Sequence, residues 1–164
     1  IVVTADHETG GIALGTGRYA LNLKALENQK ASAEELSKKI SDLRKAKNNH
    51  VAWEDVKNLL SEQMGFWSVL PISWEQEKKL RDEYEKSFVK NKVEFAESMY
   101  AKTEPMAAKA KEVMDQIAMV GWTSGGHSAG YVPVFAIGAG SDLFIGKMDN
   151  TEIPRRIAKA GGYK

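Results

Sequence analysis

Glycine and charge divide this chain into three segments and limit what it can fold into. Of its 14 glycines, 13 lie in residues 1–23 or 118–164, and only Gly65 lies between them. The middle segment, residues 24–117, has 34 charged residues among its 94, against 11 among the 70 residues of the two flanks. Glycine disfavours helix interiors and permits tight turns. We therefore expect an α/β chain in which a helical segment is inserted between two flanks of strands and turns.

The middle segment has the local signals of four helices. Ser32 and Ser73 each begin a capping-box sequence. Gly65 is placed to end the helix that begins near Val51, and Pro105 fits the first turn of the last helix. The apolar residues recur at helical spacing and predict these buried faces: Leu36, Ile40 and Leu43; Trp53, Val56, Leu59, Leu60 and Met64; Leu80, Tyr84, Phe88, Phe95 and Met99; Met106, Val113, Met114 and Ile117. Such faces are typical of a packed helical core.

The flanks read as short strands and turns. Residues 1–5 begin with an apolar, β-branched run that predicts a buried strand, and residues 131–137 predict another, with Pro133 indicating an edge or a bulge. Residues 143–145 form a short element, and a final helix is expected near 153–160. Proteins seldom begin in the middle of a core, and there is no initiator Met. We therefore expect a segment cut from a longer chain.

Composition excludes several classes of site. There is no cysteine, which rules out disulfides, thiolate zinc sites and cysteine nucleophiles. The net charge of +1 does not suggest a surface for nucleic acid, and no apolar run is long enough to span a membrane. Imidazole chemistry must use His7, His50 or His127. His50 lies among polar and charged neighbours, so we expect it in an exposed loop.

Two motifs suggest chemistry that their surroundings do not support. Residues 15–20 fit G-x-G-x-x-A, but no clear helix follows, and loop glycines are the better interpretation. Residues 126–130 fit G-x-S-x-G, the nucleophile elbow of α/β-hydrolases. The elbow requires a helix after the serine and a histidine further along the chain, whereas a strand is expected here and no histidine follows His127. Ser128 as a nucleophile is therefore a minor alternative.

A third motif joins a carboxylate and an imidazole at the end of the first strand. Asp6 and His7 lie in the run Thr4–Gly11, where a glycine turn begins. Carboxylate oxygen and imidazole nitrogen are good zinc ligands, although for the pair taken alone a capped turn with a hydrogen-bonded histidine is the better explanation. His127 lies in another glycine-rich loop beside a predicted strand. Two such loops on one sheet can converge on one site.

These segments together resemble the alkaline phosphatase family. Residues 4–11 are similar to its metal-binding motif, residues 122–138 to its last histidine loop and strand, and residues 142–146 and 149–153 to its C-terminal end. The resemblance implies the C-terminal part of an α/β sandwich built on a largely parallel sheet. Residues 1–23 and 118–164 would then belong to the catalytic core. Residues 24–117 would form a helical insertion, a cap or crown over the active site.

The resemblance also implies an activity and a set of ligands. It implies a zinc-dependent enzyme that hydrolyses phosphate monoesters through a phospho-enzyme, with two zinc ions and a magnesium ion. By the family pattern Asp6 and His7 bind one zinc and His127 binds the other. We expect Glu8 and Thr9 to support the turn around these ligands. The family's nucleophile and its remaining ligands lie N-terminal to this motif and are absent here. We therefore expect no catalytic residue in these 164 residues, weak zinc binding and no activity of the chain alone.

Further expectations concern partners and location. The missing N-terminal part of the chain is an expected partner. A strand without its sheet neighbours tends to pair with another chain, so we also expect a homodimer. The family resemblance implies a periplasmic or extracytoplasmic protein. The alternatives are a phosphodiesterase or sulfatase of the same superfamily, an α/β-hydrolase that uses Ser128, and a non-catalytic interaction module built from residues 24–117.

Overall fold

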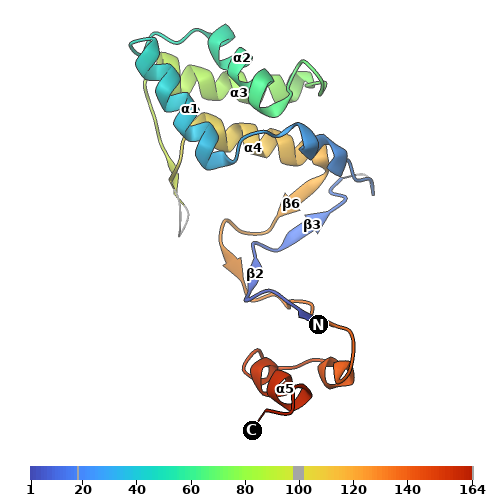
Figure 1. The fold of residues 1–164 in the computed structure, drawn as a ribbon. Coiled ribbons are helices and arrows are strands. Elements are labelled where there is room, and N and C mark those ends of the chain that lie inside the picture. The colour runs from blue at the N-terminus through green and yellow to red at the C-terminus, as the bar shows by residue number, and fades with distance from the viewer. Residues whose placement is uncertain (18, 98–101, 164) are drawn as a thin grey trace. The chain divides into compact units, whose positions relative to one another are not determined.

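The computed structural model of this chain describes residues 1–17, 19–97 and 102–163, which form two compact units (Figure 1). The helical unit is Ile12–Trp122. The site unit combines Ile1–Gly11 with Thr123–Lys164. The helical unit thus contains the expected insertion together with the residues on either side of it. The assignment of the two flanks to a catalytic core remains a prediction.

The four helices expected in the middle segment are present in the helical unit. They are α1 (Ala33–Ala46), α2 (Trp53–Met64), α3 (Trp74–Tyr84) and α4 (Pro105–Ala118), preceded by the 3-10 helix η1 (Leu23–Asn28). Helix α4 packs against α1, α2, α3 and η1 (Figure 1). The Ser32 hydroxyl accepts from the Glu35 amide, and Ser73 forms a capping box with Gln76. Gly65 ends α2 in the left-handed conformation, with φ of 72°.

The third helix is shorter than the sequence pattern predicts. Helix α3 passes into a π-helical turn, η2 (Glu85–Val89), and Asn91 then adopts a left-handed φ of 52°. Asparagine tolerates this conformation, but an α-helix cannot continue through it. The chain turns instead into β4 (Ala96–Glu97), which pairs antiparallel with β5 (Lys102–Thr103). Phe95 is consequently 48% exposed, and Met99 lies outside the described residues.

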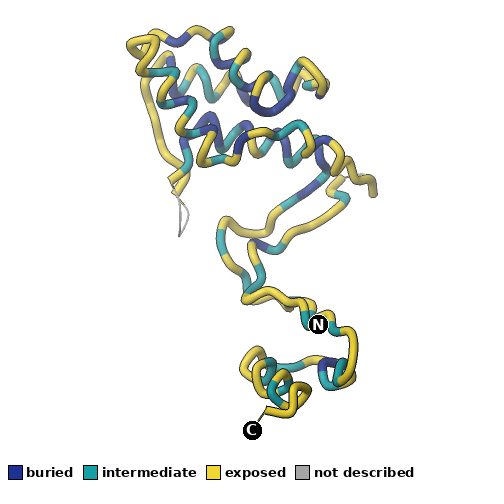
Figure 2. Tube along the Cα trace, in the orientation of Figure 1, coloured by how far each residue is buried: buried dark blue, intermediate teal, exposed yellow. Residues whose placement is uncertain are grey.

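The hydrophobic core lies in the helical unit (Figure 2). Most of the predicted apolar positions are buried there: Leu36, Ile40, Trp53, Val56, Leu60, Met64, Leu80, Phe88, Met106, Val113 and Met114. Glu104 is also buried, with 1% of its surface exposed. Its carboxylate accepts from the amides of Met106 and Ala107 at the start of α4 and pairs with Arg44 at 2.8 Å. The buried charge of Glu104 is thus compensated by an ion pair and by two backbone hydrogen bonds.

The strands form short antiparallel pairs. In the helical unit β3 (Ile12–Leu14) pairs with β6 (Val120–Trp122). In the site unit β1 (Val2–Val3) pairs with β8 (Phe135–Ala136), and β2 (Glu8–Thr9) with β7 (His127–Ser128). The mixture of helix and strand confirms the α/β class. The largely parallel sheet was expected of a complete fold and remains a prediction.

The first strand is not buried as predicted. Val3 and Phe135 of the β1–β8 ladder, and Ile1 and Ile137 next to it, are 57% to 86% exposed. Among the described residues this ladder has two strands, and the side chains of Val3 and Phe135 stand exposed on its faces. Burial of a strand depends on its neighbours in space, which the run of apolar residues does not specify.

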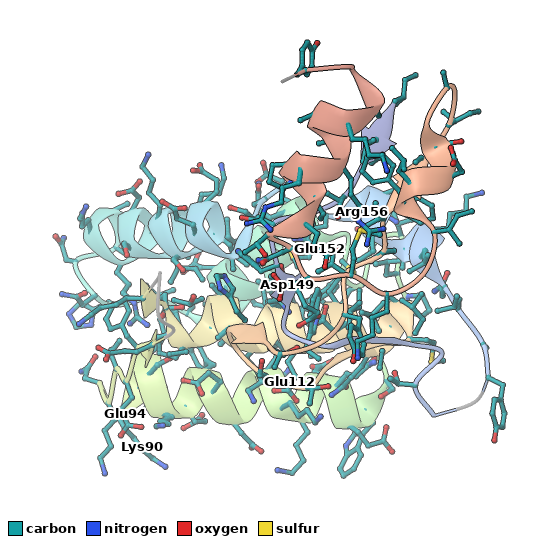
Figure 3. All side chains as sticks on the ribbon, turned by 90° about the horizontal axis from the view of Figure 1, so that it is seen from below. Lys90, Glu94, Glu112, Asp149, Glu152 and Arg156 are labelled. Carbon is teal, nitrogen blue, oxygen red and sulfur yellow. The ribbon has the colours of Figure 1, made fainter. Side chains whose placement is uncertain are left out.

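The C-terminal part of the site unit is helical. It contains the 3-10 helix η3 (Ser141–Phe144), which overlaps the element predicted at 143–145, and α5 (Glu152–Ala160), the predicted final helix. Arg156 pairs with Glu152 one turn earlier on α5 and donates to the Leu143 carbonyl of η3 at 2.6 Å (Figure 3). Throughout the ranges that the structure describes, no helix has both the length and the apolar character needed to cross a membrane.

Candidate functional site

The two histidine loops meet across the β2–β7 ladder in the site unit. Glu8 lies opposite Ser128, and Thr9 lies opposite His127. The rings of His7 and His127 stack, with centroids 3.5 Å apart and planes inclined by 29°. Two motifs separated by most of the chain therefore lie together, as the sequence led us to expect.

The glycine turn after β2 lets the second loop lie against the first. Gly10 and Gly11 have φ of 85° and 61°. The Gly10 carbonyl accepts from the amide of Thr123 at 2.8 Å. A Cβ on Gly11 would lie 2.7 Å from the Thr123 hydroxyl oxygen, which donates to the Gly11 carbonyl at 2.9 Å. Glycine is needed at position 11 for its conformation and for this close approach.

His7 presents one nitrogen toward Asp6. Its Nδ1 lies 3.0 Å from the Glu8 carbonyl oxygen, which can only accept a hydrogen bond. In the neutral imidazole this hydrogen bond places the proton on Nδ1 and leaves a lone pair on Nε2. Nε2 lies 3.4 Å from Oδ2 of Asp6, whose side chain is 85% exposed. The other Asp6 oxygen accepts from the His7 amide at 3.0 Å.

The Asp6–His7 pair fits a zinc ion as part of a ligand set. With zinc–nitrogen and zinc–oxygen bonds of about 2.0–2.1 Å, two ligands of a tetrahedral zinc lie about 3.3–3.4 Å apart. The distance between Nε2 and Oδ2 matches that separation. Among the residues described, no group of three or more carboxylate or histidine side chains is arranged to hold a metal ion. The donors therefore suit zinc without forming a complete site.

A cavity of about 270 Å³ lies beside these donors. Asp6, His7, Glu8, Ser128 and Tyr131 are among the residues that line it. Its volume lies slightly below the range of about 300–1,000 Å³ that is usual for sites of drug-sized ligands. The cavity has room for a group as small as a phosphate.

Glu8 connects the two loops. One carboxylate oxygen accepts from the Gly11 amide at 2.6 Å, and the other accepts from the Ser128 hydroxyl. The hydrogen bond from Ser128 lowers the pKa of Glu8 most. Backbone amides lower this pKa further, and partial burial opposes them. Glu8 is thus ionised at neutral pH. Thr9, expected to support the same turn, is exposed and lies opposite His127 in the ladder.

Sequence reasoning considered Ser128 as an alternative nucleophile and did not predict its contact with Glu8. Its partnership with Glu8 follows from the register of the ladder, in which the two residues face each other. Knowledge of this register would have been enough to predict that Glu8 and Ser128 are partners. The sequence does not reveal the register, because strands of two residues are too short to show an alternation of polar and apolar residues.

The nucleophile-elbow geometry is absent around Ser128. Ser128 lies on β7, and no helix lies between it and β8. An elbow would place the serine at a sharp turn from a strand into a helix. The arrangement therefore does not support the α/β-hydrolase alternative.

The glycines of residues 15–17 belong to a structural loop of the helical unit. The amides of Gly15 and Thr16 donate to the Met119 carbonyl at 2.9 and 3.2 Å. These amides are therefore not directed at a phosphate, while Arg18 of the same motif lies outside the described residues. His50 is exposed in the loop before α2, as predicted.

Comparisons with known proteins agree on one family. The alkaline phosphatase family model matches residues 1–163. The chain is 30% identical to alkaline phosphatase 3 of Bacillus subtilis, in an alignment that covers 99% of this chain and 30% of that protein. It is 25% identical to alkaline phosphatase 4 of the same organism, with 97% of this chain and 29% of that protein covered.

A solved structure supports the same relationship. The chain is similar to a cold-active alkaline phosphatase from a psychrophilic Shewanella species, with a TM-score of 0.62 and 25% sequence identity. The match covers 96% of this chain and 33% of that one. The chain thus spans about a third of the length of these relatives.

Proposed function

This chain belongs to the alkaline phosphatase family, and we propose that it supplies Asp6, His7 and His127 to a two-zinc site for the hydrolysis of phosphate monoesters. One observation carries the proposal. The β2–β7 ladder brings the two motifs together and stacks the His7 and His127 rings with their centroids 3.5 Å apart. Asp6 and His7 would hold one zinc and His127 the other.

The chain's own residues prepare the donors. The Glu8 carbonyl holds the His7 proton on Nδ1, so Nε2 offers its lone pair beside Oδ2 of Asp6. Glu8 and the Gly10–Gly11 turn fix the loop that carries His7 against the loop that carries His127. When bound, a pair of zinc ions stabilises the negative charge that develops on the attacking and leaving oxygens in phosphoryl transfer. The cavity lined by Asp6, His7 and Tyr131 would receive the phosphate group.

Three donors are too few for the complete reaction. A catalytic zinc takes about three protein ligands, so two ions need about six. We propose that the family's nucleophile, which forms the phospho-enzyme, the magnesium ligands and the other zinc ligands come from outside these 164 residues. The isolated chain would then bind zinc weakly and hydrolyse no phosphate ester.

The proposed partners follow from the same incompleteness. They are a phosphate monoester, the rest of a family-length chain and a second copy of the protein, in a periplasmic or extracytoplasmic setting. The exposed apolar side chains of Ile1, Val3, Phe135 and Ile137 support a partner on the β1–β8 ladder.

Zinc content and phosphatase activity test the proposal together. Both are measured at alkaline pH on the 164-residue chain and on a family-length protein that contains it. We expect zinc and activity in the long protein. Asp6→Ala, His7→Ala and His127→Ala in that protein should each lower the zinc content and abolish most of the activity. His50→Ala is the matched control, because His50 is exposed and belongs to the helical unit.

A family-length protein that hydrolyses phosphate esters without zinc would refute this proposal. The same conclusion follows if His127→Ala keeps full zinc content and activity. A comparison of phosphate monoesters, phosphodiesters and sulfate esters as substrates then separates the phosphatase from the other enzymes of its superfamily.

A further inference from the structure

A side-chain hydrogen bond crosses the ladder that joins the two histidine loops. Ser128 donates its hydroxyl proton to Oε2 of Glu8. Glu8 directly follows His7 in sequence, and Ser128 directly follows His127. The bond therefore links the immediate neighbours of the two proposed zinc-binding histidines.

We propose that the hydrogen bond between Glu8 and Ser128 is a positioning device that fixes His127 relative to His7, and so sets the spacing of the two parts of the zinc site. The inference rests on the proposed function and deepens it. It gives Ser128 a positioning role and extends that of Glu8 beyond the glycine turn.

Both partners are held so that the bond can transmit position. Oε1 of Glu8 accepts from the Gly11 amide at 2.6 Å, which ties the carboxylate to its own turn. The Ser128 hydroxyl oxygen accepts from the Gly130 amide at 3.3 Å while its proton goes to Glu8. Neither side chain can rotate without losing a second hydrogen bond.

The space around the bond is also adapted to it. A Cβ on Gly130 would lie 3.0 Å from Cγ of Glu8 and 3.3 Å from Oγ of Ser128. A side chain at position 130 would press on both partners. Glycine at this position therefore lets the carboxylate and the hydroxyl approach each other.

The ladder alone fixes the histidines weakly. It contains two residues on each strand, and a shift of register by one residue turns every side chain to the opposite face. Such a shift would separate the His7 and His127 rings. A charge-assisted hydrogen bond between the facing residues Glu8 and Ser128 opposes that shift.

The ring contact can be measured in the metal-free 164-residue chain by proton NMR. In the unaltered chain we expect nuclear Overhauser effects between the ring protons of His7 and His127, which stack with centroids 3.5 Å apart. Ser128→Ala should remove these effects, and Ser128→Thr, which keeps the hydroxyl, should retain them. Ser124→Ala is the matched control, because the Ser124 hydroxyl in the same loop donates to the Gly126 carbonyl and not to Glu8.

A zinc titration followed by the same ring signals is the second measurement. Loss of a residue that orients a metal ligand typically lowers metal affinity by about 10- to 100-fold, and we expect this of Ser128→Ala and of Glu8→Ala. The double variant should be no weaker than Glu8→Ala, because both changes remove the same bond. Ser128→Thr keeps the hydroxyl and should bind zinc as tightly as the unaltered chain. If Ser128→Ala weakened zinc binding only by disturbing the packing of the loop, the larger threonine would weaken it as well.

The outcomes separate this inference from the proposed function. If the unaltered chain shows no ring contact, or if Ser128→Ala keeps both the contact and the zinc affinity, the positioning role is wrong. If Ser128→Thr behaves like Ser128→Ala, the role is wrong as well. If the ring contact responds as expected but no zinc binds even to a family-length protein, the positioning role holds and the zinc proposal fails.

Discussion

The helical unit and the site unit are stabilised in different ways. The hydrophobic core cluster lies within the helical unit, from Ala25 to Met114. In the described part of the site unit, Phe144 is the one buried large apolar side chain, and Val3 and Phe135 of the β1–β8 ladder are exposed. The site unit relies instead on local hydrogen bonds, such as those of Glu8 and Thr123.

This difference shows how the chain separates stability from chemistry. Burial of apolar surface is the main favourable contribution to folding, and the helical unit buries such a surface in its own hydrophobic core. Hydrogen bonds fix geometry but add little net stability each. The site unit therefore has a defined local arrangement, and its stability should depend on what packs against its apolar faces.

The largest expected effect comes from the core of the helical unit. Phe66 is fully buried, and Phe66→Ala should lower the free energy of unfolding of this unit by about 3–5 kcal/mol. Phe135→Ala in the exposed ladder is the matched control and should cost far less. Denaturant unfolding followed by far-UV circular dichroism measures both. Equal losses for the two variants would contradict the contrast between the units.

A somewhat smaller effect is expected from the buried charge at the start of α4. Glu104→Ala leaves Arg44 without its carboxylate partner and removes the cap of α4, so we expect a loss of about 3 kcal/mol. Glu104→Gln keeps an oxygen for the cap and should cost less. The same unfolding experiment measures this series. A neutral result for Glu104→Ala would mean that the ion pair and the cap contribute nothing measurable.

The apolar ladder of the site unit should mediate self-association. Val3 and Phe135 face each other across β1 and β8, and both are exposed. Val3→Lys places a charge on this surface, and we expect about a tenfold or greater weakening of dimer formation, equivalent to about 1.4 kcal/mol or more. Analytical ultracentrifugation measures the dissociation constant, with Val69→Lys on an exposed residue of the helical unit as control. A monomeric unaltered chain at high concentration would exclude this interface.

The sequence predicts the helices of this chain well because their signals are local. Ser32, Ser73 and Gly65 mark ends of α1, α3 and α2 within a few residues of the chain itself. The end of α3 is not predicted by the apolar spacing, which continues to Met99. The π-helical turn η2 and the left-handed Asn91 end the helix before that point. The prediction that β1 is buried was wrong. Burial of a strand depends on the elements that pack on it, and the apolar run Ile1–Val3 does not determine these elements.

The site is predictable to the level of its motifs. Asp6, His7 and His127 are recognisable from the sequence, and their roles as metal ligands remain predictions. The contact between His7 and His127 depends on the register of β2 and β7, each of two residues. No alternation of polar and apolar residues can specify so short a ladder. The hydrogen bond between Glu8 and Ser128 therefore could not be predicted from the sequence and is found only in the structure.

The smallest expected effect concerns a carboxylate at the edge of the helical core. Glu83 lies on α3, and its Oε1 is buried without a hydrogen-bond partner among the residues described. Burial raises the pKa of Glu83 above its usual 4.5. Lys86 and Lys109 lower this pKa, whereas the negative charge of Glu104 raises it.

The sign of the pH dependence follows from that direction. Because the pKa is higher in the folded state than in the unfolded chain, protonated Glu83 favours folding, and this contribution is lost as the pH rises through the folded-state pKa. Glu83→Gln removes the charge, so we expect its midpoint of thermal unfolding to exceed that of the unaltered chain by a few degrees at pH 8, an effect of order 1 kcal/mol or less. The advantage should shrink near pH 4. Glu85→Gln, at an exposed position nearby, should show no such crossover. If Glu83→Gln and Glu85→Gln behave alike in circular dichroism melts at both pH values, the burial of Glu83 does not limit the stability of the helical unit.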